Sequence, residues 1–167
     1  NFVTGPGRTL GQALIESPEV DGVTFTGSFD VGMKIFRDFA AGRWVRPAIL
    51  ELGGKNPAIV SRHADLERAA TGIVRSAFGL QGQKCSACSR VYVEKPVADA
   101  LRALLVEKTR MISVGDPTLR QHWMGPVINE AAFGRYRKCV ENLRQHGAEL
   151  VGGETLDRGD LANGWFV

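Results

Sequence analysis

Hydrophobic and polar positions follow two different periods in the first 60 residues of the chain. Short runs of β-branched, aromatic and aliphatic residues, which are typical of strands, occupy residues 1–5, 23–27, 47–52 and 57–60. Apolar residues three or four positions apart, as on one face of a helix, occupy residues 7–17 and 28–42. Because strands and helices alternate in this way, the pattern predicts an α/β fold built on a parallel sheet.

The alternation continues beyond two adjacent glycines, Gly53 and Gly54, which place an expected domain boundary between residues 1–52 and 53–167. A helix is expected over residues 64–79, with Asp65 as its N-cap and Gly79 at its end, and Ser28 is expected to start the earlier helix. The remaining expected elements are a strand at 90–94, helices at 97–112 and 131–147, and turn-rich segments at 114–126 and 152–164.

Composition and charge narrow the class of protein. With 167 residues, 44% of them hydrophobic, the chain is able to bury a core. Its net charge is only +3 and its basic residues are scattered. AAGRWVRPA (40–48) is the most suggestive basic and aromatic stretch, but nucleic-acid binding requires a denser patch and is not expected. The sequence has no run long enough to span a membrane, and its three cysteines fit a reducing compartment such as the cytoplasm. Since the chain opens on NFVTGPG and closes on NGWFV, we expect a segment of a longer protein.

Two glycine-containing segments each follow an expected strand and open an expected helix: TGPGRTLG (4–11) and TGSFDVG (26–32). Glycine lets a ligand approach the backbone, and the unpaired N–H groups of a helix N-terminus favour an anion, so these segments are candidates for phosphate or dinucleotide binding. Neither segment has the G-x-G-x-x-G spacing or the Walker pattern. Ordinary turns between strand and helix are the competing interpretation, and the pattern alone leaves both open.

Glu51 lies in an apolar run, between Leu50 and Leu52, near the expected carboxyl end of a strand. Parallel sheets place ligands at that edge, so Glu51 is a candidate general base. A glutamate that simply faces solvent at a strand end is the competing interpretation, and the position of Glu51 taken by itself favours it.

The segment GQKCSACSR (82–90) holds two of the three cysteines, Cys85 and Cys88. A thioredoxin-like pair would stand at the start of a helix after a strand, whereas here a helix precedes the pair and a strand follows. Zinc would need four ligands, and Cys139 and the three histidines are dispersed, so no metal site is expected. A single nucleophilic thiol near glycines fits better. Cys88 and Cys139 are then expected to be small, buried packing residues.

Five motifs follow one another along the chain: FTGS (25–28), ELGGKNP (51–57), GQKC (82–85) with Arg90 five residues after the cysteine, GDP (115–117) and MGPVI (124–128). In their order and spacing they resemble the motifs of the aldehyde dehydrogenase family. The resemblance covers essentially the whole chain. It implies that residues 1–52 are the later part of a Rossmann-like NAD(P)-binding domain and that residues 53–167 begin an α/β catalytic domain.

By position in these motifs, the resemblance implies that Cys85 is the catalytic nucleophile and Glu51 the general base. Cys88 stands where the family usually has a small residue. The implied cofactor contacts are Gly27 and Ser28 at the pyrophosphate, Gly5, Gly7 and Val31 around the adenosine, and the backbone of Leu52 near the nicotinamide.

The implied reaction is oxidation of a small-molecule aldehyde to a carboxylate, through a thiohemiacetal and a thioester on the cysteine, with NAD or NADP as cofactor. The resemblance also implies a homo-oligomer, since the family usually forms dimers or tetramers. The family's oxyanion-hole asparagine and further ribose-binding residues have no matching motif in these 167 residues. The chain by itself is therefore expected to be inactive.

The segment SAFGLQGQKCSACSR (76–90) looks most like the branch of the family that oxidises glutamate semialdehyde, the open form of Δ1-pyrroline-5-carboxylate, in proline catabolism. A general aldehyde dehydrogenase of broad substrate range is the alternative. Two other classes stay open, a thiol-disulfide oxidoreductase that uses Cys85 and Cys88, and a non-catalytic relative that binds nucleotide. The presence of both Cys85 and Glu51 argues against the last.

Overall fold

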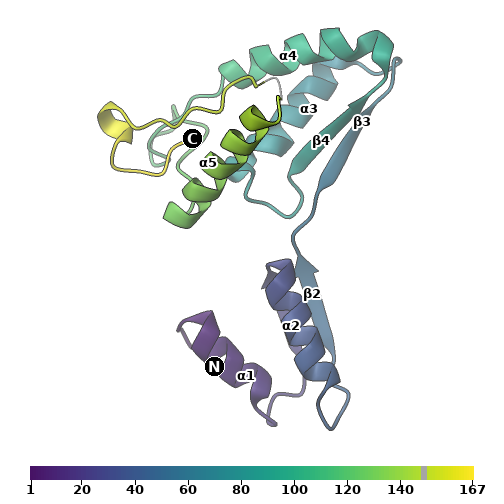
Figure 1. The fold of residues 1–167 in the computed structure, drawn as a ribbon, viewed down its shortest axis with the longest axis vertical. Coiled ribbons are helices and arrows are strands. Elements are labelled where there is room, and N and C mark those ends of the chain that lie inside the picture. Colours follow the sequence, from purple (N-terminus) through teal and green to yellow (C-terminus); the bar gives the residue numbers. More distant parts are fainter. Residues whose placement is uncertain (148–149) are drawn as a thin grey trace. The chain divides into compact units, whose positions relative to one another are not determined.

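A computed structural model describes residues 1–147 and 150–167 of the chain (Figure 1). These residues form two compact units, Asn1–Gly54 and Lys55–Val167, and each unit has its own two-stranded parallel sheet. Helices and strands alternate along the chain, which confirms the expected α/β class. The division between the units lies two residues after the expected domain boundary.

The first unit contains a π-helical turn, two α-helices and two strands: η1 (Gly7–Gly11), α1 (Gln12–Glu16), β1 (Val23–Gly27), α2 (Phe29–Ala40) and β2 (Ala48–Leu52). As expected, Ser28 is the N-cap of α2, and its Oγ accepts a hydrogen bond from the backbone N–H of Val31 at 3.4 Å. The strand expected at residues 1–5 is wrong. Within the described residues the sheet of this unit consists of β1 and β2, and an extended segment without a neighbouring strand forms no ladder.

The core of the first unit lies on one face of its sheet. Ile15 of α1 and Ile35 and Phe39 of α2 are buried there against the half-buried side chains Val20, Val23, Phe25, Ala48 and Leu50. Gly32 lets α2 approach β2 closely, because a Cβ atom at this position would collide with the side chain of Leu52. The alternate strand positions, which include Ile49 and Glu51, point away from this core and are exposed.

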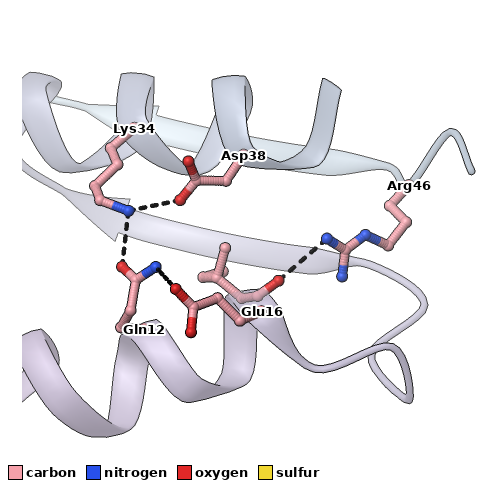
Figure 2. A network of polar contacts seen from close by, with 6 residues as sticks. Gln12, Glu16, Lys34, Asp38 and Arg46 are labelled. Carbon is pink, nitrogen blue, oxygen red and sulfur yellow. Dashed lines mark hydrogen bonds and ion pairs between the residues drawn. The ribbon is translucent and has the colours of Figure 1, made fainter. Parts of the chain in front are cut away.

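Polar contacts join α1 to α2 and to the loop that precedes β2 (Figure 2). The Lys34 ammonium donates to Gln12 Oε1 at 2.7 Å and to Asp38 Oδ2 at 2.6 Å. Arg46 reaches the end of α1, where its guanidinium donates to the Ile15 carbonyl at 3.1 Å. It also lies 3.9 Å from the ring centre of Phe39. Arg46 therefore supplies a hydrogen-bond donor to a carbonyl group at the end of α1 and also packs against Phe39 of the core.

The described residues of the second unit, 55–147 and 150–167, form two strands, three α-helices and three short 3₁₀ turns. These are β3 (Asn56–Val60), α3 (Leu66–Phe78), η2 (Gly79–Gly82), β4 (Cys88–Val93), η3 (Lys95–Val97), α4 (Ala98–Arg110), α5 (Glu130–Gln145) and η4 (Gly159–Leu161). The caps of α3 are those expected, because Asp65 Oδ1 accepts from the Arg68 N–H at 3.1 Å and Gly79 follows the last turn. β4 begins two residues earlier than expected, at Cys88.

The core of the second unit forms where α3 and α4 pack beside the β3–β4 sheet, as Figure 1 shows. Its buried residues are Val60, Ala70, Ile73 and Leu101. On the surface, Lys108 of α4 pairs with Glu67 of α3 at 2.9 Å. Within the part of the chain that the structure describes, no helix combines the length and apolarity needed to cross a membrane.

Candidate active site

Cys85 lies in an exposed loop between η2 and β4. Inside this loop the Ala87 N–H donates to the Lys84 carbonyl at 3.2 Å and so forms a tight turn around the cysteine. The side chain of Asn56, the first residue of β3, approaches from the neighbouring strand. Its Nδ2 donates to the Cys85 carbonyl at 2.5 Å and to the Ala87 carbonyl at 3.3 Å.

A left-handed turn delivers the chain into this loop. Leu80, Gln81 and Gly82 have φ values of 53°, 56° and 69°, and the Gln83 N–H closes the turn on the Leu80 carbonyl at 3.0 Å. Side chains on Leu80 and Gln81 make this conformation costly, at roughly 1–2 kcal/mol per residue. The sequence indicated glycines near the thiol but not this turn, because neither leucine nor glutamine signals positive φ.

Two glutamines of this turn bind the MGPVI motif (124–128). Gln83 Oε1 accepts from the backbone N–H of Ile128 at 3.0 Å. In the orientation that satisfies both ends of its amide, Gln81 accepts from the Gly125 N–H at 2.9 Å and donates to the Leu80 carbonyl at 3.2 Å. The structure thus brings together two motifs about 40 residues apart, a contact that sequence reasoning did not predict.

The other two cysteines are placed differently from Cys85. Cys88 is half-buried at the start of β4, where its N–H donates to Ser76 Oγ at 3.1 Å and its thiol donates to the Arg90 carbonyl at 3.3 Å. It also lines an apolar cavity of about 270 Å³ between α3, α4 and β4. Cys139 is exposed, so its expected burial is wrong: α5 turns Val140 toward the core instead.

Glu51 belongs to the first unit, in β2, where it lies opposite Thr26 of β1. Its side chain is exposed on the sheet face away from the α1–α2 core, near the carboxyl end of the strand as expected. Cys85 belongs to the second unit. Each unit therefore carries one of the two residues for which chemistry is expected.

Four of the expected cofactor residues come together at the carboxyl end of the first sheet. Gly27 lies opposite Leu52 in the parallel register, and Ser28 binds Val31 in the first turn of α2. The side chain of Leu52 packs against Gly32 of α2, so the cofactor contact expected from Leu52 would have to come from its backbone. Gly5 and Gly7 lie on a separate turn, at the start of η1.

The turn between β1 and α2 has features that suit an anionic cofactor group, although two features oppose it. The α2 helix is twelve residues long, and its N-terminus carries a positive partial charge and unpaired N–H groups beside a glycine. Asp30 in the first turn works against an anion, and the Val31 N–H is already taken by Ser28. The donors that remain free are those at the very start of the helix, where the expected contacts Gly27 and Ser28 lie.

The GDP motif (115–117) has a structural explanation. Hydrogen bonds from the Thr118 N–H and hydroxyl, at 2.9 and 2.8 Å, lower the pKa of Asp116 below its ordinary value. Gly115 lies directly against the ring of His122, which in turn bonds Ser113 Oγ through Nδ1 at 2.9 Å. Among the described residues no cluster of three or more side chains is suited to hold a metal ion.

The family is decided by comparison with known proteins. The model of the aldehyde dehydrogenase family matches residues 1–167. The chain belongs to the aldehyde dehydrogenase family. Its expected membership, drawn from FTGS, ELGGKNP, GQKC, GDP and MGPVI, is thereby confirmed.

Several members of the family are close in sequence. A 1-pyrroline-5-carboxylate dehydrogenase of Geobacillus thermodenitrificans is 40% identical over 171 residues, which cover 100% of this chain and 32% of that protein. An alpha-ketoglutaric semialdehyde dehydrogenase of Bacillus subtilis is 42% identical over 168 residues, covering 100% of this chain and 34% of that protein. The chain thus spans about a third of the length of these curated relatives.

The fold is shared with solved aldehyde dehydrogenases. The crystal structure of a 1-pyrroline-5-carboxylate dehydrogenase from Thermus with bound NAD superimposes with a TM-score of 0.90. Its sequence is 33% identical, and the match covers 99% of this chain and 32% of that one. The chain therefore shares its fold with the corresponding third of a solved aldehyde dehydrogenase.

Proposed function

We propose that the chain is part of an NAD(P)-dependent aldehyde dehydrogenase that oxidises an aldehyde to a carboxylate, with Cys85 as nucleophile and Glu51 as general base. In this proposal residues 1–52 belong to the cofactor domain and residues 53–167 to the catalytic domain. The family match over residues 1–167 and the NAD-bound Thermus relative support the reaction class and the cofactor, with NADP as the alternative cofactor.

The observation that carries the assignment of Cys85 is its placement. Cys85 is exposed in a loop whose backbone Asn56 binds, whereas the half-buried Cys88 donates its thiol hydrogen to the Arg90 carbonyl at the start of β4. An attacking sulfur has to reach a substrate carbon while its backbone stays fixed, and of the two cysteines only Cys85 meets both conditions.

The proposed reaction begins when the Cys85 thiolate attacks the aldehyde carbon and forms a thiohemiacetal, whose oxyanion requires N–H donors. The bound nicotinamide cofactor supplies the hydride acceptor for the oxidation that leaves a thioester on Cys85. Glu51 then removes a proton from water, and the resulting nucleophile hydrolyses the thioester to the carboxylate. Gly27, Ser28 and the residues around them would hold the cofactor at the N-terminus of α2.

For the substrate we propose a semialdehyde that carries a carboxylate, and specifically glutamate semialdehyde in equilibrium with Δ1-pyrroline-5-carboxylate. Relatives with 1-pyrroline-5-carboxylate dehydrogenase names support the specific choice. The alpha-ketoglutaric semialdehyde dehydrogenase of similar identity supports the wider class, since its substrate has the same pair of functional groups. A general aldehyde dehydrogenase of broad range is the alternative.

The test is steady-state kinetics of the full-length polypeptide, followed by the absorbance of the reduced cofactor. Glutamate semialdehyde, alpha-ketoglutaric semialdehyde and an uncharged aliphatic aldehyde are compared with NAD and with NADP. We expect the highest kcat/KM for glutamate semialdehyde, and activity lost in Cys85→Ala. A kcat/KM no higher than that of the aliphatic aldehyde would reject the semialdehyde assignment, and inactivity with all three would reject the reaction class.

We propose that the enzyme works in a reducing compartment. Cys85, Cys88 and Cys139 are all free thiols, which supports a reducing compartment such as the cytoplasm.

We also propose a homo-oligomer, a dimer or tetramer. Light scattering of the full-length polypeptide tests this, and a monomer at all concentrations would contradict it.

A further inference from the structure

The amide nitrogen of Asn56 contacts the loop of the expected nucleophile. Its Nδ2 donates to the carbonyls of Cys85 and Ala87, at 2.5 and 3.3 Å. The backbone carbonyl of Asn56 in turn accepts from Ser89 Oγ at 3.5 Å. Three contacts therefore connect one residue of β3 to the turn that carries Cys85 and to the strand β4 that follows it.

The 2.5 Å contact acts on the backbone carbonyl of Cys85 and not on its thiol. A peptide group is planar, so fixing the Cys85 carbonyl also fixes the plane of the bond between Cys85 and Ser86. The carbonyl direction is set by ψ of Cys85, the torsion beside the Cα that bears the thiol. Holding that oxygen from β3 therefore restrains the direction in which Sγ leaves the loop.

The pairing of β3 with β4 directs the Asn56 side chain toward the loop. Asn56 is opposite Cys88, whereas the next residue, Pro57, is opposite Arg90, so that Ser89 is an additional residue in β4. A bulge of this kind changes the aim of the side chains next to it and is common beside active sites. The bulge lies at the end of the loop that carries Cys85, where it can direct the side chain of Asn56 toward that loop.

We propose that Asn56 is a positioning residue for Cys85: its amide holds the Cys85–Ser86 peptide so that the thiol is aimed at the aldehyde carbon. This rests on the proposed function, in which Cys85 is the nucleophile. Asn56 itself touches neither substrate nor cofactor in this scheme. It lies five residues after Glu51, so one short segment supplies both the general base and the residue that aims the nucleophile.

The test uses two variants of the full-length polypeptide that remove the amide donors in different ways. Asn56→Asp keeps the shape but sets a carboxylate against two carbonyl oxygens, and Asn56→Leu removes the polar group without adding charge. The matched control is Asn142→Asp, the same substitution on the exposed surface of α5, away from the loop. The three are compared for kcat, for KM of NAD and aldehyde, and for amide hydrogen exchange of residues 84–88.

In both Asn56 variants we expect kcat to fall by about tenfold to a hundredfold, since a misplacement on the order of 1 Å can cost that much. The KM for NAD should stay at the parent value, because the expected cofactor residues belong to the first unit. Amide exchange of residues 84–88 should accelerate while that of α3 stays unchanged. Asn142→Asp should leave all of these at parent values.

The outcomes separate the two proposals. If the parent is active and both Asn56 variants keep its kcat, the positioning role is wrong while the proposed function stands. A fall in kcat confined to Asn56→Asp would show an effect of the new charge and would also overturn the positioning role. If the parent oxidises no aldehyde, the proposed function fails and the positioning role falls with it. Variants that do not fold are identified by faster exchange throughout α3. In that case kcat is measured for Ser89→Ala, which loses only the weaker contact to Asn56, and a smaller fall in kcat is expected.

Discussion

Gln83 and Ile128 are joined by a hydrogen bond from the Ile128 backbone N–H to the Gln83 side-chain oxygen, at 3.0 Å and across 45 residues. The same side chain donates to the Leu80 carbonyl at 3.3 Å. Gln83 therefore closes the left-handed turn before Cys85 and attaches it to the MGPVI segment. The turn contains two non-glycine residues with positive φ, so its conformation depends on such external support.

Replacing Gln83 with methionine should release this attachment. Methionine has a similar length but no oxygen, so we expect the Ile128 amide to exchange with solvent faster and the chain to lose about 0.5–1.5 kcal/mol of unfolding free energy. Gln83→Glu separates the two bonds, because it retains an acceptor for the Ile128 N–H but loses the donor to the Leu80 carbonyl. Equal Ile128 exchange rates in the parent and in Gln83→Met would contradict a role for this bond.

Gly82 is the residue of the turn that tolerates substitution least. Its φ is +69°, and a Cβ atom there would lie 2.9 Å from the Ala77 carbonyl oxygen. Gly82→Ala should therefore destabilise the chain by more than about 1 kcal/mol in urea unfolding. Gly72→Ala, in the middle of α3 with open space around it, should stabilise by about 0.5–1 kcal/mol. The two substitutions should therefore change the unfolding free energy in opposite directions. Destabilisation of equal size at both sites would show that the backbone conformation is not the cause.

Features of the fold that depend on neighbouring residues in the sequence could be predicted. The apolar spacing of residues 28–42 gave α2, and Ser28 and Asp65 were identifiable as N-caps because a cap acts within three residues. The position of Glu51 near a strand end was predictable because it depends on the apolar residues beside it in the sequence. The strand expected at residues 1–5 failed, since strand formation depends on a partner elsewhere in the chain.

What could not be predicted at the candidate site depends on contacts between distant residues. Asn56 and Cys85 are 29 residues apart, and Gln83 and Ile128 are 45 apart, so neither hydrogen bond leaves a periodic pattern. Leu80 has no local preference for positive φ and adopts it only because the surrounding turn requires it. Cys139 was expected inside from its residue type, but helix phase decides which side of α5 is buried.

Arg46 should be a main contributor to the stability of the first unit. Its guanidinium donates to the carbonyls of Ile15, Ser17 and Val20 at 3.1, 3.1 and 3.4 Å and packs on Phe39. Because hydrogen bonds to charged groups contribute about 1.5–3 kcal/mol, Arg46→Met should lower the unfolding free energy of this unit by an amount of that order.

The matched control for Arg46 is Lys34→Met. Lys34 also binds two partners in the network of Figure 2, but its side chain is 54% exposed. Exposed pairs contribute about 0–1 kcal/mol, so this variant should change stability far less. Hydrogen exchange of the α1 and β1 amides measures both, and a larger effect from Lys34→Met would contradict the role assigned to Arg46.

Tyr136 should make the stability of the chain fall at alkaline pH. Burial, followed by the charge of Glu154, raises the pKa of its phenol above the ordinary value of 10.0. A raised folded pKa means that the neutral form is favoured in the folded state. Its stabilising contribution is therefore fully present below pH 10.0 and is lost as the pH rises through the folded pKa.

Tyr136→Phe should remove that alkaline loss. At neutral pH the variant gives up the hydrogen bond to the Glu154 carbonyl, 3.3 Å in length, and should be less stable by about 0.5–1.5 kcal/mol. Urea unfolding measured at neutral pH and above pH 10.0 tests both effects. Parallel pH profiles for the parent and Tyr136→Phe would show that Tyr136 does not cause the loss.

Cys85 and Cys88 separate the dehydrogenase from a dithiol enzyme. As a dehydrogenase, the full-length polypeptide should lose aldehyde oxidation in Cys85→Ala and keep it in Cys88→Ala, because the Cys88 thiol is bonded to the Arg90 carbonyl and faces an apolar cavity. Cys88→Ala should cost about 1 kcal/mol of stability through lost packing. A thiol-disulfide oxidoreductase would need both sulfurs, so its insulin-reduction activity would disappear in either variant. Loss of aldehyde oxidation in a folded Cys88→Ala protein would give Cys88 a chemical role that its half-buried position at the start of β4 does not suggest.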